Sequence, residues 1–140
     1  MKVRDAMHKG VEWAGPRTPV REIARLMREY DIGAIPIGEN DRLIGMVTDR
    51  DIVCNGLARE GFDANVATAR DVMTPSIHCC RDDDDLGKAI EHMEKLKVRR
   101  LPVINRNKRM VGMLSLGDLG QSAPQDLVAD CVKSVSAHHQ

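Results

Sequence analysis

Two copies of a short motif, a hydroxyl residue followed three positions later by an aspartate, are the residues of this chain best suited to chemistry. They are Thr48-x-x-Asp51 and Ser115-x-x-Asp118. A carboxylate can accept hydrogen bonds from both hydroxyls of a diol, and a helix start offers free N–H groups and a positive dipole end to a phosphate. The same pattern is a variant of the capping box, which stabilises a helix start without any ligand. The motifs therefore predict either a ligand site or a pair of helix caps.

Three arginines and one step of small residues accompany these motifs. Arg50 lies inside the first motif, and Arg99 and Arg100 come just before a predicted strand. Guanidinium groups bind phosphates through paired, planar hydrogen bonds, but exposed arginines can equally be solvated or paired with nearby acids. The step Gly33-Ala34 leaves backbone open for a planar base, or is only the tight start of a strand. Both interpretations stay open for each feature.

The cysteines do not form a recognisable metal or catalytic pattern. The four are Cys54, Cys79, Cys80 and Cys131, with no CxxC spacing. In an extended segment, His78-Cys79-Cys80 would point neighbouring side chains to opposite faces, which leaves a zinc site incomplete. No base is suggested near a cysteine nucleophile. We therefore expect reduced thiols, no metal and no catalytic residue.

The composition excludes several classes of function. The chain has 140 residues, and 21 Lys and Arg balance 21 Asp and Glu, so no nucleic-acid partner is expected. We expect no signal peptide, because no apolar run follows the first residues, and the sequence has no apolar run of about eighteen residues. We therefore expect a cytoplasmic protein without a membrane partner. No nucleophile–base arrangement and no glycine-rich phosphate loop is visible, so we expect no enzyme.

An internal repeat organises the chain. Arg4-Asp5-Ala6-Met7 matches Arg70-Asp71-Val72-Met73 at an offset of 66 residues, from Met7 to Met73. The same offset relates two runs of apolar residues with helical period, at positions 20, 23, 24, 27 and 30 and at 86, 89, 90, 93 and 96. After one inserted residue, the two Thr/Ser-x-x-Asp motifs match at 67. Matched blocks in the same order indicate a duplicated unit.

Each repeat predicts the order β-α-β-β-α. The paired strands are Ala34–Ile37 with Leu43–Val47, and Leu101–Ile104 with Met110–Leu114, each pair followed by a helix beginning at Thr48 or Ser115. Thr18 before Pro19 predicts a helix N-cap, and Asp82–Asp85 place negative charge at the start of the equivalent helix. Because Pro36 and Pro102 lack a backbone N–H, their strands are expected to be edge or bulged strands.

These elements predict an α/β fold with two repeats packed as a pseudo-two-fold pair. The expected divisions are 1–60 for the first repeat with its N-terminal segment, 61–68 for a linker, 69–122 for the second repeat and 123–140 for a C-terminal helix and tail. Neither half is large enough to bury its sheet easily alone, so the two should pack sheet to sheet.

The repeats resemble the CBS domain family over about residues 3–120. In the first repeat the resemblance is carried by Thr18-Pro19-Val20, 32–37 (IGAIPI) and 45–52 (GMVTDRDI), and in the second by 98–103 (VRRLPV) and 112–119 (GMLSLGDL). Stand-alone bacterial CBS pairs, including those of the hypoxic-response type, are the most similar within the family.

This resemblance implies a regulatory adenosine sensor with a ligand in the cleft between the repeats. The motif of one repeat would hold ribose and phosphate, and the strand start of the other would hold adenine. Carried over by position, site A comprises Thr18, Ile32, Gly33, Ala34, Pro36, Ser115 and Asp118. Site B comprises Thr48, Arg50, Asp51, Val98, Arg99, Arg100 and Pro102.

The resemblance also implies ligands and partners. AMP, ADP, ATP, NAD and S-adenosylmethionine are the ligands that such a cleft would take as regulators, with none obligatory as a cofactor. A homodimer and an unidentified target protein are expected partners, and the ligand would signal through a change of conformation or partner. The alternative is an interaction module with an empty cleft that works through homo-oligomerisation in a stress response.

Overall fold

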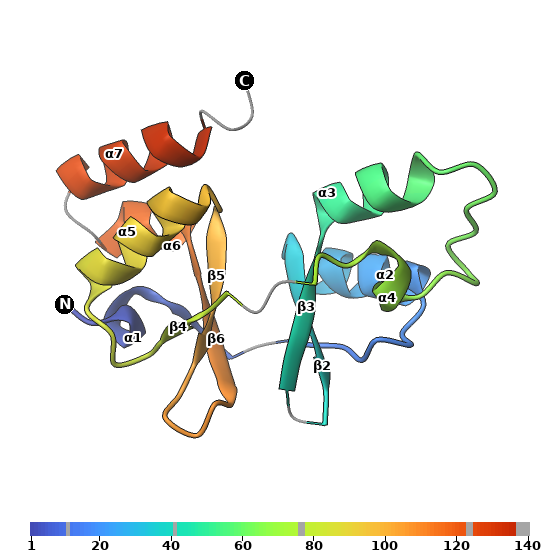
Figure 1. The fold of residues 1–140 in the computed structure, drawn as a ribbon, viewed down its shortest axis with the longest axis horizontal. Coiled ribbons are helices and arrows are strands. Elements are labelled where there is room, and N and C mark those ends of the chain that lie inside the picture. Colours follow the sequence, from blue (N-terminus) through green and yellow to red (C-terminus); the bar gives the residue numbers. More distant parts are fainter. Residues whose placement is uncertain (11, 41, 76–77, 123–124, 137–140) are drawn as a thin grey trace. The chain divides into compact units, whose positions relative to one another are not determined.

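The chain folds into two units that do not follow the order of the sequence (Figure 1). A computed structural model describes residues 1–10, 12–40, 42–75, 78–122 and 125–136. The central unit is Val11–Ile77, and the terminal unit joins Met1–Gly10 to His78–Gln140. No helix in the described ranges is long and apolar enough to cross a membrane.

The central unit packs helices against a hairpin. Helix α2 (Val20–Tyr30) is followed by strands β2 (Ala34–Glu39) and β3 (Arg42–Thr48), which pair antiparallel. The short helix α3 (Asp49–Asp51) continues as a π-helical segment, η1 (Ile52–Leu57), and α4 (Ala69–Val72) closes the unit. The buried faces of these elements form one aliphatic core: Val20, Ile23, Met27, Ile35, Ile37, Val47, Ala69 and Val72.

The terminal unit repeats this plan and extends it. It contains α1 (Val3–Ala6), β1 (His8–Lys9), β4 (Cys80–Arg81), α5 (Leu86–Leu96), β5 (Arg100–Ile104), β6 (Met110–Ser115), α6 (Leu116–Ser122) and α7 (Gln125–Ser136). Its sheet has the order β1-β6-β5-β4. Cys131 and Val135 on α7 are buried in its core. Residues 123–124 and 137–140 of the predicted C-terminal segment lie outside the described residues.

The two units have the same internal topology, as the offset in the sequence predicts. In the terminal unit β4 runs parallel to β5, pairing Cys80 with Val103, and in the central unit Ala14 pairs in parallel with Ile37. On the other side of each hairpin, His8 pairs with Met113 and Thr74 pairs with Met46, both antiparallel. The α/β fold with two equivalent repeats is therefore confirmed.

The first segment of each sequence repeat belongs to the other repeat's unit. Residues 1–10 carry the start of the first repeat but join the terminal unit, whereas residues 69–75 carry the start of the second and join the central unit. Val3 and Ala6 are buried in the terminal core, and Ala69 and Val72 in the central core. The expected boundaries at residues 60, 68 and 122 concern the sequence repeats and stay a prediction. The two units that bury the cores instead meet between residues 10 and 11 and between residues 77 and 78.

This exchange explains why the predicted cap at Thr18 is wrong. Helix α2 begins at Val20, with Pro19 rather than Thr18 in the N-cap position. The backbone of residues 18–20 pairs instead with residues 67–69, where the exchanged segment begins: the Ala69 N–H donates to Thr18 O and the Val20 N–H donates to Ala67 O. This extended pairing holds Thr18 outside the helix.

The strands that contain proline are bulged, as expected. The register shifts between Ile37 and Gly38 in β2 and between Val103 and Ile104 in β5. Strand β5 nevertheless lies inside the sheet, between β6 and β4. Strand β4 has two residues and pairs only with Val103 and Ile104. The missing N–H of Pro102 therefore costs no hydrogen bond between β4 and β5.

Candidate functional site

Each predicted motif forms a complete capping box at the end of a hairpin. In the central unit, Thr48 Oγ1 accepts from the Asp51 N–H at 3.1 Å, and Asp51 Oδ2 accepts from the Thr48 N–H at 2.9 Å. In the terminal unit, Ser115 Oγ accepts from the Asp118 N–H at 3.2 Å, and Asp118 Oδ2 accepts from the Ser115 N–H at 3.0 Å. Each capping box therefore satisfies two backbone N–H groups at its helix start without a ligand.

The two carboxylates differ at their second oxygen. Asp51 Oδ1 accepts from the Thr74 hydroxyl at 3.2 Å and from Asn55 Nδ2 at 3.3 Å. Asp118 Oδ2 takes a further bond from the Ser115 hydroxyl at 3.0 Å, but Asp118 Oδ1 has no hydrogen-bond partner in the described part of the chain. A carboxylate has about four lone-pair positions, two on each oxygen. Oδ1 of Asp118 therefore keeps both of its positions open, whereas Oδ1 of Asp51 already accepts two bonds.

Each motif lies against the strand start of its own hairpin. The Asp49 N–H donates to Gly33 O at 3.0 Å, and the Leu116 N–H donates to Arg99 O at 3.0 Å. In register, Ala34 is opposite Thr48 and Arg100 is opposite Ser115. Each unit thus places a strand start directly beside the motif of the same repeat.

The residues of the two predicted sites divide between the units. Site A takes Thr18, Ile32, Gly33, Ala34 and Pro36 from the central unit and Ser115 and Asp118 from the terminal unit. Site B takes Thr48, Arg50 and Asp51 from the central unit and Val98, Arg99, Arg100 and Pro102 from the terminal unit. Within one unit the structure brings together the strand start and the motif of the same repeat. The grouping across repeats stays a prediction.

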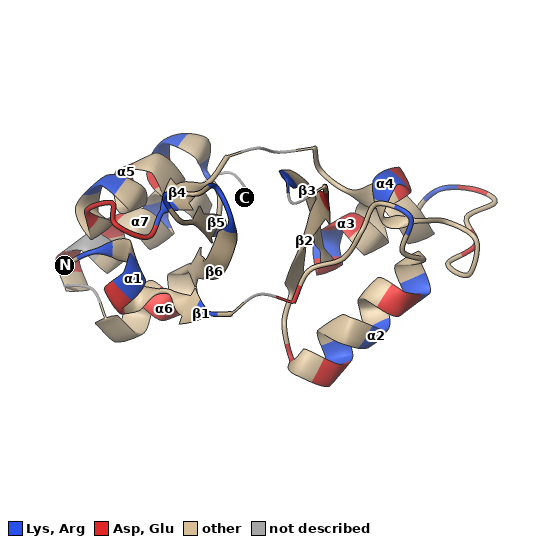
Figure 2. Ribbon diagram, turned by 90° about the horizontal axis from the view of Figure 1, so that it is seen from below, with Lys and Arg blue, Asp and Glu red and all other residues tan. Residues whose placement is uncertain are grey.

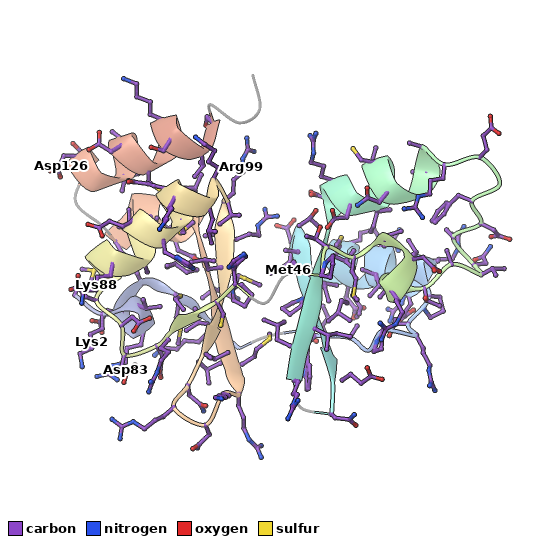
Figure 3. All side chains as sticks on the ribbon, viewed as in Figure 1. Lys2, Met46, Asp83, Lys88, Arg99 and Asp126 are labelled. Carbon is purple, nitrogen blue, oxygen red and sulfur yellow. The ribbon has the colours of Figure 1, made fainter. Side chains whose placement is uncertain are left out.

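Two of the three predicted arginines carry charges that are exposed to solvent. Arg50 and Arg99 are exposed and make no ion pair with any residue that the structure describes, and Figure 3 marks Arg99 beside the start of β5. Their charges are therefore available to an anion.

The acidic run Asp82–Asp85 lies between β4 and α5 (Figure 2), where Asp84 Oδ2 accepts from the Arg81 N–H at 2.9 Å.

Asn55 and Thr74 are the residues near the motifs that the sequence did not indicate. Asn55 bridges Asp51 to the backbone, since its Nδ2 also donates to Val72 O at 3.2 Å. Thr74 lies just after the repeated block that ends at Met73, where the first repeat has His8. Only the exchange of segments brings Thr74 to Asp51, and no periodicity in the sequence carries that information.

Cysteines and histidines do not gather into a metal centre among the described residues, where no group of three or more His, Cys, Asp or Glu could hold an ion. Burial raises the pKa of the Cys80 thiol to about 12, with the charge of Asp84 adding to the effect. Burial, with Glu94 nearby, raises the pKa of Cys131 to about 11. Cys54 is exposed. The rings of His78 and His92 meet edge to face, with centroids 6.0 Å apart.

The model of the CBS domain family matches residues 3–55 and 69–120. The chain belongs to the CBS domain family. Hypoxic response protein 1 of Mycobacterium tuberculosis is 41% identical over 133 residues, which cover 94% of this chain and 92% of that protein. The match leaves only a small part of this relative uncovered. This agrees with the predicted resemblance to stand-alone CBS pairs.

Two solved structures bear on the candidate site. A crystal structure of Hypoxic Response Protein I with two coordinated zinc ions is 41% identical, with a TM-score of 0.77, and the match covers 89% of this chain and all of that one (100%). A crystal structure of CBSX2 in complex with AMP is 27% identical, with a TM-score of 0.73, covering 87% of this chain and 95% of that one.

The burial of the cysteines predicts how fast each thiol reacts. At about pH 8, where the thiolate is the reactive form, we expect exposed Cys54 to react rapidly with a disulfide reagent. We expect Cys80 and Cys131 to react only after unfolding, because burial raises their pKa to about 12 and about 11. All four thiols should titrate in denaturant, with no zinc retained after dialysis. One zinc per chain that survives dialysis, or a disulfide in fresh protein, would show that the expectation is wrong.

Proposed function

We propose that this chain is a regulatory CBS pair that binds an adenosine compound and signals the occupancy of its site. The observation that carries the proposal is the Ser115–Asp118 half-site. It joins an open carboxylate oxygen and a helix start to the backbone of residues 98–100. CBSX2, solved with AMP, supports this class of ligand.

The proposed ligand uses the chemistry of both repeats. Its ribose hydroxyls donate to a motif carboxylate. In site A its phosphate accepts from the Thr18 hydroxyl, and in site B it meets exposed guanidinium groups such as Arg50 or Arg99. Its adenine lies along the backbone at Gly33-Ala34 or at the equivalent strand start. This arrangement requires the repeats to pack as the pseudo-two-fold pair that the sequence predicts. A cytoplasmic homodimer that passes the signal to a target protein completes the proposal.

A ligand-free interaction module is the second candidate. The observation that favours it is the completeness of both capping boxes, in which the hydroxyl and the carboxylate of each motif accept from the backbone N–H groups of the same two residues. In that case the motifs only stabilise helices, and the chain works through oligomerisation.

A thermal-shift series separates the two candidates. The purified chain is heated with AMP, ADP, ATP, NAD or S-adenosylmethionine at increasing concentration. A ligand that binds the folded chain stabilises it by about 2.7 kcal/mol at a hundredfold excess over Kd. We expect at least one of the five to raise the unfolding temperature in a saturable way, while inosine monophosphate, which lacks the adenine amino group, raises it less. No shift with any of the five would favour the ligand-free module.

A further inference from the structure

We infer that Thr74 closes the Thr48–Asp51 half-site to a ribose diol, so that Asp51 acts as a structural carboxylate in the wild-type chain. This inference rests on the proposed function, because it concerns how many of the two motifs accept the ligand. It is drawn from two hydrogen bonds of Asp51, to Asn55 and Thr74, that the Thr48-x-x-Asp51 motif does not predict.

Three of the about four acceptor positions of Asp51 are filled, by donors from three different parts of the chain. Asp51 Oδ2 accepts from the Thr48 N–H at 2.9 Å at the end of β3. Asp51 Oδ1 accepts from Asn55 in η1 at 3.3 Å and from Thr74 after α4 at 3.2 Å. A diol that binds side-on to a carboxylate donates to both of its oxygens or twice to one of them. At Asp51 it would have to displace at least one of these donors.

Thr74 is held in place independently of its hydroxyl. Its N–H donates to Met46 O at 2.9 Å and its carbonyl accepts from the Met46 N–H at 3.0 Å, and Figure 3 marks Met46 on β3. This backbone pairing fixes the hydroxyl beside Asp51 at little further entropic cost. An incoming ligand hydroxyl therefore competes with a preorganised donor.

The terminal unit provides the natural comparison. The same backbone pairing joins His8 to Met113, so a histidine stands where the central unit has Thr74. Neither His8 nor any other described residue donates to Asp118 Oδ1. At the position equivalent to Asn55 by the 67-residue offset the chain has Ser122. Both donors that close Asp51 are thus replaced, and Asp118 keeps one open oxygen.

The change that tests this inference is Thr74→Val, which removes the hydroxyl and keeps the shape of the side chain. Calorimetry with AMP is run on the wild-type chain, on Thr74→Val, on Asp118→Ala and on the double variant. We expect about one AMP per wild-type chain, and a second one in Thr74→Val. Against the Asp118→Ala background, Thr74→Val should tighten AMP binding about tenfold or more, the scale of one hydrogen bond to a charged group.

Two further variants control for folding and for the loss of a threonine. Thr74→Ser keeps the hydroxyl and should bind AMP like the wild type. Thr68→Val removes a hydroxyl just before the exchanged segment, where Thr68 Oγ1 donates to Asp71 Oδ2 at 3.3 Å and not to Asp51. This variant should leave AMP affinity unchanged. Thermal unfolding of each variant confirms that it folds.

The outcomes separate this inference from the proposed function. If the wild type binds AMP and Thr74→Val changes neither stoichiometry nor affinity, the inference is overturned and the proposed function stands. If the wild type and Thr74→Val both fail to bind AMP, ADP, ATP, NAD and S-adenosylmethionine, the proposed function and the inference are overturned together.

Discussion

The Gly112→Ala variant should lose its N-terminal segment from the terminal unit and fall in stability by about 1–3 kcal/mol or more, the range for atoms forced into a filled space. A Cβ at Gly112 would collide with the carbonyl oxygen of His8 and lie 2.9 Å from Met7 Sδ. The sulfur can move, but His8 O belongs to the backbone of β1, which pairs with β6 at Lys9↔Gly112. Relief of the clash therefore requires β1 to separate from the sheet.

Urea denaturation measures the loss of stability, and hydrogen exchange at residues 3–10 measures the separation. Gly120→Ala is the matched control, because a Cβ there meets no atom within 4 Å and Gly120 lies in helix α6. Alanine in place of an exposed helical glycine should stabilise by about 0.5–1 kcal/mol. If Gly112→Ala is as stable as Gly120→Ala, the close approach of β1 to β6 does not exist in solution.

The sequence predicted the elements that periodicity and local chemistry determine. The apolar positions of 20–30 and 86–96 place one face of each helix against a sheet, and α2 and α5 have those bounds. Both capping boxes form within four residues of chain, so the sequence motif is enough to predict them. Short-range interactions leave few alternatives to these structures.

Long-range pairing determines what the sequence could not predict. The backbone of Thr18 has a local preference for a cap, but its bonds to the exchanged segment at Ala69 take precedence. The same exchange places Thr74 on Asp51 across 23 residues of chain. Because β-pairing depends on which strand edges meet, no single repeat read by itself contains this information.

Asp118→Ala should abolish most nucleotide binding, whereas Asp51→Ala should change it much less. Asp118 has an acceptor oxygen without a partner among the described residues, so we expect the ribose to use it. Loss of a hydrogen bond to a charged group costs about 1.5–3 kcal/mol, which is roughly ten- to a hundredfold in Kd. Asp51 is already engaged by Thr74 and Asn55, and its loss should act on stability.

The groups expected near the phosphate also favour nucleotide binding at site A, with Asp118, over site B, with Asp51. The predicted site A includes Thr18, and the position equivalent to Thr18 at the 66-residue offset is Asp84. Their backbones match, since Thr18 O accepts from Ala69 and Asp84 O accepts from Val3. A hydroxyl can donate to a phosphate, but a carboxylate repels it by roughly 1–4 kcal/mol at about 4 Å in a medium between water and a protein surface. Arg50, Arg99 and Arg100 would have to offset this repulsion in site B.

Each substitution removes the carboxylate of one capping box, so the two variants control for each other's loss of a helix cap. Calorimetry with AMP and with ATP gives their affinities, and urea denaturation gives their stabilities. We expect the larger loss of affinity in Asp118→Ala and the larger loss of stability in Asp51→Ala, since Asp51 also ties η1 and the segment after α4 to β3. If Asp51→Ala loses binding while Asp118→Ala keeps it, the order of the two sites is reversed. If both variants bind like the wild type, the motifs are helix caps and the ligand, if one is bound, is held by other residues.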